Sequence, residues 1–235
     1  ENTIPRSIHS NKRVFCGVPL REEFVYNKNQ NNNHNKRNAF NILIFGGSLG
    51  SVFFSTEIPK ALCFLDKDLK KQLNITHQVN PSKISLVKNN YLSNNISSKV
   101  DSFFNDIFKY YIKADLIICR SGGTTLAEII SLKIPSIIIP LENSLDDHQS
   151  INSKIISNNK LGWVINQKDF KLKEFNSIIK NLIVNPNTIK NIKSNFLSLE
   201  KKNNKLLNYN SSNEVLFQSI CTTLNQDMIK KESTK

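Results

Sequence analysis

Residues 40–50 read FNILIFGGSLG and residues 116–128 read LIICRSGGTTLAE, and these two stretches decide the fold. Each is a short apolar run that leads into a glycine-rich turn and then into a segment with helical spacing. Short buried strands that alternate with helices are typical of a parallel sheet covered on both faces. We therefore expect an α/β fold, with a Rossmann-like, mostly parallel sheet and helices on both faces.

The same alternation continues on both sides of these stretches. Strands are expected at 41–45, 75–79, 116–119, 136–139 and 162–165, with weaker candidates at 13–16, 84–87 and 100–104. Helices are expected at 51–73 with a break near Pro59, at 105–113, 124–132 and 147–159, and with breaks from 171 to about 225. Ligands of such sheets bind beyond the carboxyl ends of the strands.

Composition divides the chain into four parts. Residues 1–26 form a junction segment, and residues 27–38 are almost all Asn, Lys and Gln, which cannot bury a core and predict a polar loop. Residues 39–205 hold the sheet pattern, and residues 206–235 form a helical tail. The chain starts at Glu1 without an initiator Met, which we interpret as a sign of a further upstream segment.

Charge and cysteine content narrow the function classes. The net charge of +13 indicates either an anionic partner or a coding bias toward Lys, Asn and Ile. No zinc knuckle, RNA-binding motif or basic–aromatic stripe supports nucleic acid, so no nucleic-acid partner is expected. The longest apolar run, 134–141, is strand-sized rather than membrane-spanning. Four widely spaced cysteines without a CxxC motif favour a reducing, cytoplasmic compartment.

The two glycine-rich turns are Gly46-Gly47-Ser48 and Ser121-Gly122-Gly123, and each stands between an expected strand and an expected helix. Glycines allow a ligand to approach the backbone, and amides at a helix start favour an anion. Two such turns at one sheet edge could hold one diphosphate. The alternative is a pair of tight strand-to-helix turns, with Ser48 capping its helix.

Each polar residue after the second turn has either a structural or a ligand-binding interpretation. Glu128 follows Thr125 by three residues, which fits a capping box, but a carboxylate here could also accept ribose hydroxyl groups. His148, Gln149 and Asn152 can share one helix face and suit sugar hydroxyls, or they form a solvated helix start, with Ile151 and Ile155 on the buried side. Asp147 and His148 have no companion ligands at useful spacing, so no metal is expected.

Four motifs stand in one order along the chain: GVPLR at 17–21, GGSLG at 46–50, CRSGGTTLAE at 119–128, and DHQ at 147–149 followed by Asn152. This ordered set resembles the carboxyl-terminal donor half of the MurG family. The resemblance spans about residues 10 to 170 and implies a GT-B fold with inverting, metal-independent chemistry and no cofactor. It implies transfer of N-acetylglucosamine from UDP-N-acetylglucosamine to an undecaprenyl-linked muramoyl-pentapeptide in peptidoglycan synthesis.

The resemblance also implies which residues meet the donor. Arg21 would contact the nucleotide, Glu128 the ribose hydroxyls, and the backbone of Phe104 the uracil edge. The other expected substrate-binding residues are Ser48 and Thr125 for phosphate oxygens, the amides around Gly47 and Gly123 for the diphosphate, and His148, Gln149 and Asn152 for the sugar.

The sequence departs from the family pattern in three ways. Ser51 replaces the usual Ala, Phe104 replaces a commoner aliphatic residue, and nothing matches the glycine-rich loop ending in a His that the amino-terminal half carries. His9, His34 and His77 stand in other contexts. The catalytic base is therefore expected on the amino-terminal acceptor domain, without which the transferase should be inactive.

The family also implies a place in the cell. We expect a peripheral protein on the cytoplasmic face of the inner membrane, where anionic lipids could attract the basic chain. Two alternatives stay open. One is the soluble donor subunit of a two-chain N-acetylglucosaminyltransferase that acts on dolichol-linked sugars, and the other is a non-catalytic nucleotide-binding module.

Overall fold

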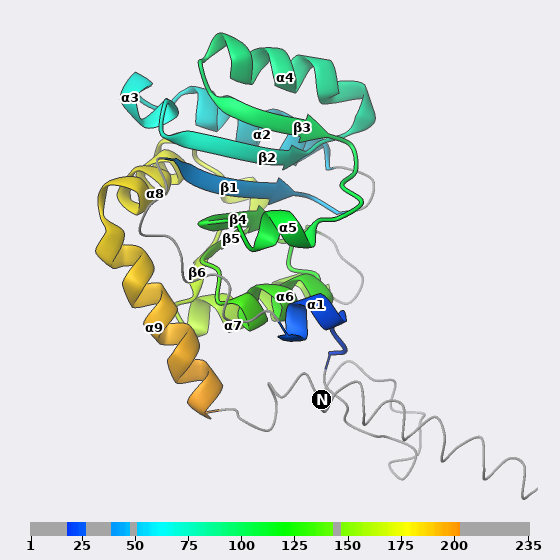
Figure 1. Cartoon of the computed structure of the whole chain (residues 1–235), viewed down its shortest axis with the longest axis vertical. Helices are drawn as coiled ribbons and strands as arrows, with labels where there is room; N and C mark the ends of the chain where they lie inside the picture. Colours follow the sequence, from blue (N-terminus) through cyan, green and yellow to red (C-terminus); the bar gives the residue numbers. More distant parts are fainter. Residues whose placement is uncertain (1–17, 27–38, 48–50, 143–146, 203–235) are drawn as a thin grey trace, which may run out of the picture.

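The computed structural model describes residues 18–26, 39–47, 51–142 and 147–202. Six parallel strands form one sheet in the order β3-β2-β1-β4-β5-β6 (Figure 1). The strands are β1 (Phe40–Phe45), β2 (Leu73–Gln78), β3 (Ser97–Asp101), β4 (Leu116–Cys119), β5 (Ser136–Ile138) and β6 (Gly162–Val164). The expected parallel, Rossmann-like sheet is confirmed.

Helices cover both faces of the sheet because the strands after β1 are added on one side of it and the strands from β4 onward on the other. Right-handed connections place the helices of the two halves on opposite faces. One face carries α2 (Val52–Cys63), α4 (Ile84–Ser93) and α8 (Leu172–Val184), and α2 contacts both of the others. The other carries α6 (Gly123–Leu132) and α7 (His148–Asn158), which contact each other. Shorter elements are α1 (Glu22–Tyr26), α3 (Lys67–Lys70), η4 (Pro81–Lys83), α5 (Phe108–Tyr111) and η6 (Gln167–Asp169), and α9 (Pro186–Lys202) follows α8.

Several element predictions were wrong in detail. Residues 84–87 form the first turn of helix α4 rather than a strand, since Val87 and Tyr91 are buried one helical turn apart. The predicted helix 51–73 is not broken at Pro59, which lies inside α2, but ends at Cys63. Strand β3 ends at Asp101, so Phe104 lies beyond it. The predicted strand at 13–16, the polar loop 27–38 and the tail from 206 lie outside the described residues.

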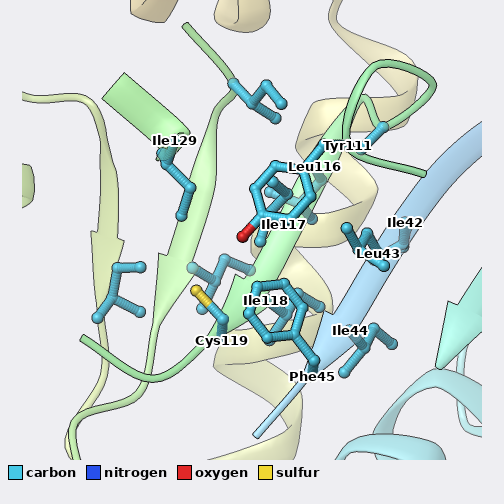
Figure 2. Close-up of a cluster of buried hydrophobic side chains, with 14 of the residues drawn as sticks. Ile42, Leu43, Ile44, Phe45, Tyr111, Leu116, Ile117, Ile118, Cys119 and Ile129 are labelled. Carbon is cyan, nitrogen blue, oxygen red and sulfur yellow. The ribbon is translucent and has the colours of Figure 1, made fainter. Parts of the chain in front are cut away.

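The core is built on the two central strands. All four residues of β4 are fully buried, as are Ile42, Leu43 and Ile44 of β1. Figure 2 shows Phe45, Cys119 and Tyr111 within one cluster of buried side chains. Because neighbouring parallel strands bury both faces, their sequences are continuous apolar runs rather than alternating ones. Among the described helices, none is long and apolar enough to cross a membrane.

The short helix α1 fastens the segment before the sheet onto helix α6. Phe24 and Val25 are buried, and the Ser131 hydroxyl donates to the Phe24 carbonyl oxygen at 2.8 Å. The Phe24 ring meets the Phe108 and Tyr111 rings edge-on, with centroids 5.0 and 5.1 Å apart. This packing fixes the backbone just after Arg21, and it brings a residue from before the sheet to Glu128 in the middle of α6.

His77 is a buried histidine in β2. Its Nδ1 atom lies 2.9 Å from the Tyr91 hydroxyl oxygen. Burial lowers the pKa of His77 from 6.5 to about 3, although the Phe54 backbone partly opposes this effect. The folded chain therefore keeps the ring neutral at a pH where the unfolded chain protonates it.

We predict that His77 makes the free energy of unfolding fall as the pH drops from 6.5 toward 3. Between these values the unfolded chain binds one more proton, which gives a slope of up to about 1.4 kcal/mol per pH unit. Urea unfolding of the wild type and of His77→Gln, measured from pH 7 to pH 4, checks this. The variant retains a partner for Tyr91 and should show a flatter profile, whereas parallel profiles would contradict the prediction.

Candidate functional site

The site lies at the carboxyl edge of the sheet, between β1 and β4. These strands are neighbours, and Phe45 pairs with Cys119 at their last shared position. From β1 the chain continues to β2 on one side, whereas β4 continues to β5 on the other. Such a reversal of strand order opens a crevice beyond the strand ends, where ligands of α/β sheets bind. Both glycine-rich turns start at this point.

The first turn needs both of its described glycines for steric reasons. A Cβ atom on Gly46 would stand 2.7 Å from the Ser51 Cβ atom and 3.2 Å from the Phe54 ring. Gly47 has a φ of 107°, a backbone conformation that side-chain-bearing residues rarely adopt. The turn therefore passes tightly over the start of α2 and presents its backbone outward. Ser48 lies outside the described residues, and the residue that precedes α2 is Ser51, so the alternative of a Ser48 cap is wrong.

The second turn leads into α6 with its first residues exposed. Gly122 is the N-cap residue and supplies no side-chain cap, and Gly123 and Thr124 face solvent. A Cβ atom on Gly123 would meet no atom within 4 Å, so no described neighbour requires a glycine there. Thr125 lies inside the first turn of α6 and cannot be its N-cap. The capping-box interpretation of Glu128 is therefore wrong.

Arg120 joins the loops that surround the site. Its guanidinium donates to the carbonyl oxygens of Ile139 at 3.0 Å and Pro140 at 2.7 Å. It also donates to the Ser51 hydroxyl at 3.0 Å and to the Gln167 side chain at 2.8 Å, and it lies over the Phe54 ring. One buried side chain thus connects the ends of β4 and β5 with the start of α2 and with η6.

Glu128 is a buried carboxylate with a partner on each oxygen. Arg21 donates to Oε1 at 3.0 Å, and the Tyr111 hydroxyl donates to Oε2 at 2.8 Å. The Glu128 side chain is 9% exposed and the Arg21 side chain is 49% exposed, so the ion pair opens to solvent on the arginine side. Burial, with the negative charge of Glu128, raises the pKa of Tyr111 well above its ordinary value. Two residues distant in sequence, Arg21 and Glu128, are thereby brought together.

The start of α7 is fastened to the second turn. The Asn152 amide donates to the Ser121 carbonyl oxygen at 3.1 Å. The Ser121 hydroxyl donates to the Gln149 carbonyl oxygen at 2.8 Å, and the Gln149 side-chain oxygen accepts from the Leu141 amide at 3.0 Å. His148 is exposed at the first position of the helix. Of the two isoleucines predicted on the buried side of this helix, Ile155 packs partly buried against the core, but Ile151 is 48% exposed, and Ile156 is the fully buried one.

Phe104 turns its side chain into the protein. It is 8% exposed, and its ring lies 5.0 Å from the Tyr110 ring. The Lys99 ammonium donates to the Tyr110 hydroxyl at 2.7 Å. Residues 102–107 lead from the end of β3 to α5, along the same edge of the sheet (Figure 1). Any contact of Phe104 with a ligand at this edge would fall to its backbone.

Sequence reasoning missed three residues of the site. Arg120 stood inside the glycine motif but was given no role, Tyr111 stood in an expected helix, and Gln167 had no sequence signal. Within the described part of the chain, no group of three or more His, Cys, Asp or Glu side chains is placed to hold a metal ion. The arrangement combines two helix starts, open backbone and one fixed carboxylate, which suits an anionic ligand that also carries hydroxyl groups.

Comparison with known proteins connects this geometry to a family. The model of the glycosyltransferase family 28 C-terminal domain matches residues 41–208. A Rickettsia bellii protein, named as UDP-N-acetylglucosamine--N-acetylmuramyl-(pentapeptide) pyrophosphoryl-undecaprenol N-acetylglucosamine transferase, is 34% identical over 74% of this chain and 49% of its own length. A protein of the same name from Vesicomyosocius okutanii is 37% identical over 76% of this chain and 48% of its own. The chain thus spans about half the length of these relatives.

Solved structures agree with the fold. The crystal structure of Acinetobacter baumannii MurG superposes with a TM-score of 0.62 and 29% identity, over 71% of this chain and 47% of that one. The glycosyltransferase WaaG, of lipopolysaccharide biosynthesis, superposes with a TM-score of 0.59 at 16% identity, over 85% of this chain and 55% of that one. At that identity WaaG supports the fold alone, which is the C-terminal domain fold of GT-B glycosyltransferases.

We predict that Arg120→Lys lowers the free energy of unfolding by about 2 kcal/mol or more. Lysine keeps the charge, but its single ammonium cannot make all four hydrogen bonds of the Arg120 guanidinium. Buried carbonyl oxygens therefore lose their partners. Urea unfolding measures the change. Arg21→Lys is the matched control, because Arg21 is half-exposed and lysine keeps a positive charge beside Glu128, so its loss should be smaller. Equal losses in the two variants would contradict the structural role of Arg120.

Proposed function

The chain belongs to glycosyltransferase family 28, whose C-terminal domain it carries in MurG-like form, and from this premise we propose that it binds UDP-N-acetylglucosamine. The proposed activity is inverting, metal-independent transfer of N-acetylglucosamine to an undecaprenyl-linked muramoyl-pentapeptide. This chain would supply the donor-binding half. The observation that carries the proposal is the fixed Glu128 carboxylate beside two open helix starts at one sheet edge.

The diphosphate is assigned to the two glycine-rich turns. Helices α2 and α6 both begin at the carboxyl edge, and neither Ser51 nor Gly122 caps its helix with a side chain. Since neither described N-cap residue occupies their first amides, we assign these amides and the positive ends of the helix dipoles to the phosphate oxygens. The hydroxyls of Ser48 and Thr125 and the backbone at Gly47 and Gly123 complete this proposed subsite.

The uridine end is assigned to Glu128 and Phe104. A carboxylate accepts hydrogen bonds from two ribose hydroxyls, as acidic residues do in other nucleotide sites. Glu128 is ionisable, buried and held at both oxygens, so it meets a ligand in a defined orientation. The buried Phe104 ring leaves its backbone to read the uracil edge. Arg21 is half-exposed beside Glu128, and we assign its contact with the nucleotide to this exposed side.

The sugar is assigned to the start of α7. His148 is exposed there, while Gln149 and Asn152 are already bonded to backbone groups of the neighbouring loops. In the proposed reaction, the acceptor hydroxyl displaces UDP directly at the anomeric carbon and inverts it. The turns and Arg21 then stabilise the negative charge that develops on the departing diphosphate. Activation of the acceptor is assigned to residues outside this chain.

The acceptor and the membrane belong to the same proposal. The relatives that are named as transferases to a pyrophosphoryl-undecaprenol are about twice as long as the matched region. We assign acceptor binding to the part of those proteins that this chain does not match. The basic charge of +13 favours a position against anionic lipids, on the cytoplasmic face of the membrane. On its own, this chain should have negligible transferase activity.

We predict that isothermal titration shows binding of UDP in preference to ADP and GDP, and that Glu128→Gln weakens UDP binding about tenfold or more. The substitution keeps the side-chain shape but removes the charge, and hydrogen bonds to a charged group are worth roughly 1.5–3 kcal/mol. Asp68→Asn is the matched control, because Asp68 is an exposed carboxylate in α3, which precedes β2 at the amino edge of the sheet.

Two results would count against the proposal. Equal affinity for UDP, ADP and GDP would favour a general nucleotide-binding module. Unchanged UDP affinity in Glu128→Gln, or an equal loss in Asp68→Asn, would remove the ribose role of Glu128.

A further inference from the structure

Tyr111 is a polar residue in an otherwise apolar cluster. Tyr111 is 1% exposed and packs against the Phe24 and Phe45 rings, with centroids 5.1 and 5.8 Å away. Figure 2 shows Tyr111 near Phe45. Phenylalanine would fill almost the same volume without burying a hydroxyl, whose burial costs free energy unless it is hydrogen-bonded. The hydroxyl donates to Glu128 Oε2 at 2.8 Å. The polar atom of Tyr111 is thus directed at the carboxylate of the proposed ribose subsite.

The two partners of Glu128 differ in how firmly they are held. Tyr111 is enclosed by aromatic rings from α1 and β1, so its hydroxyl has little freedom to move. Arg21 is 49% exposed on a long side chain and also lies 3.5 Å from the Glu23 carboxylate. A ligand can therefore replace Arg21 at Oε1, whereas the bond from Tyr111 to Oε2 persists. The hydrogen-bond donor to Oε1 can thus be exchanged for a ligand, whereas the donor to Oε2 stays in place.

The chemistry of the phenol matches an anchoring role. Burial and the adjacent carboxylate raise the pKa of Tyr111 well above its ordinary value, so its hydroxyl keeps its proton. A permanent donor leaves the remaining lone pairs of Glu128 to accept hydrogen bonds from a ligand. It also fixes the plane of the carboxylate, and so the directions in which those lone pairs point.

We propose that Tyr111 is a positioning residue that holds Glu128 in the orientation needed to recognise the two ribose hydroxyls of the nucleotide. The inference rests on the proposed function, because it presumes that Glu128 meets the ribose. It adds that selectivity for a ribose depends on a residue that never touches the nucleotide. The effect of Tyr111 should therefore depend on whether the ligand carries those hydroxyls.

The test compares two ligands across three proteins. Isothermal titration measures the affinities of UDP and of 2′,3′-dideoxyuridine diphosphate for the wild type, Tyr111→Phe and Tyr91→Phe. Tyr91→Phe is the matched control, because it also removes a buried, hydrogen-bonded hydroxyl, in this case one paired with His77 on the other face of the sheet. Thermal melting without ligand confirms that each variant is folded.

We expect the wild type to prefer UDP about tenfold, and Tyr111→Phe to reduce this preference to about threefold or less, through weaker UDP binding. Its affinity for the dideoxy ligand should change less than about twofold, and Tyr91→Phe should match the wild type. In a Glu128→Gln background, Tyr111→Phe should have no further effect on the preference.

Other outcomes separate the positioning role from the ribose contact. Equal losses for both ligands in Tyr111→Phe, or a further loss of preference in the Glu128→Gln background, would overturn the positioning role while leaving the proposed ribose contact in place. A wild type that binds both ligands equally would overturn the ribose contact itself, and the inference with it. If Tyr111→Phe melts below the assay temperature, the same affinity ratios are measured at a lower temperature, where the variant is folded.

Discussion

The structure depends on the parallel pairing of β1 with β4. This pairing places Phe45 beside Cys119, so the two strands end together although 74 residues separate them in sequence. The glycine-rich turns that follow are therefore neighbours, and the helices that begin after them cover opposite faces of the sheet. A crevice with two helix starts on its rim follows from strand order alone. Arg120 then bonds across this rim and holds the loops together.

The second constraint is electrostatic. Glu128 is a buried carboxylate, which is stable only because Arg21 and Tyr111 donate to it. Glu128 lies about one helical turn after Thr125, close to the amides proposed to bind the diphosphate. If its negative charge were unpaired, it would repel the ligand. Arg21 counters that charge, and the proposal places its exposed side against the nucleotide. The same three residues thus stabilise the fold and shape the charge of the proposed donor site.

The sequence predicted the features that depend on local pattern. Apolar runs ending in glycines placed β1, β4 and both turns, because a buried parallel strand and a tight turn leave clear signatures. The strand predicted at residues 84–87 was wrong, because a short apolar run does not distinguish a strand from the first turn of a helix. The capping-box alternative for Glu128 failed for a related reason: helix α6 starts at Gly123, two residues before Thr125.

Features that depend on tertiary contacts were not predictable. Nothing in the spacing of Tyr111, Arg21 and Glu128 indicates that they meet, since 107 residues separate Arg21 from Glu128. Likewise, the four partners of Arg120 come from three distant loops, and the pattern around Gln167 is that of an ordinary polar turn. The family resemblance named most of the proposed donor contacts, but it did not reveal which side chains hold those contacts in place.

The central claim is that a uridine diphosphate binds where β1 and β4 end. Its most direct test is a titration of the isotope-labelled chain with UDP, followed by the shifts of backbone amide resonances in nuclear magnetic resonance spectra. We predict that the largest shifts fall on Gly46, Gly47, residues 122–125 and Glu128, with α3 and α9 unaffected. Shifts concentrated on α3 and α9, or spread evenly over the basic surface, would contradict the claim.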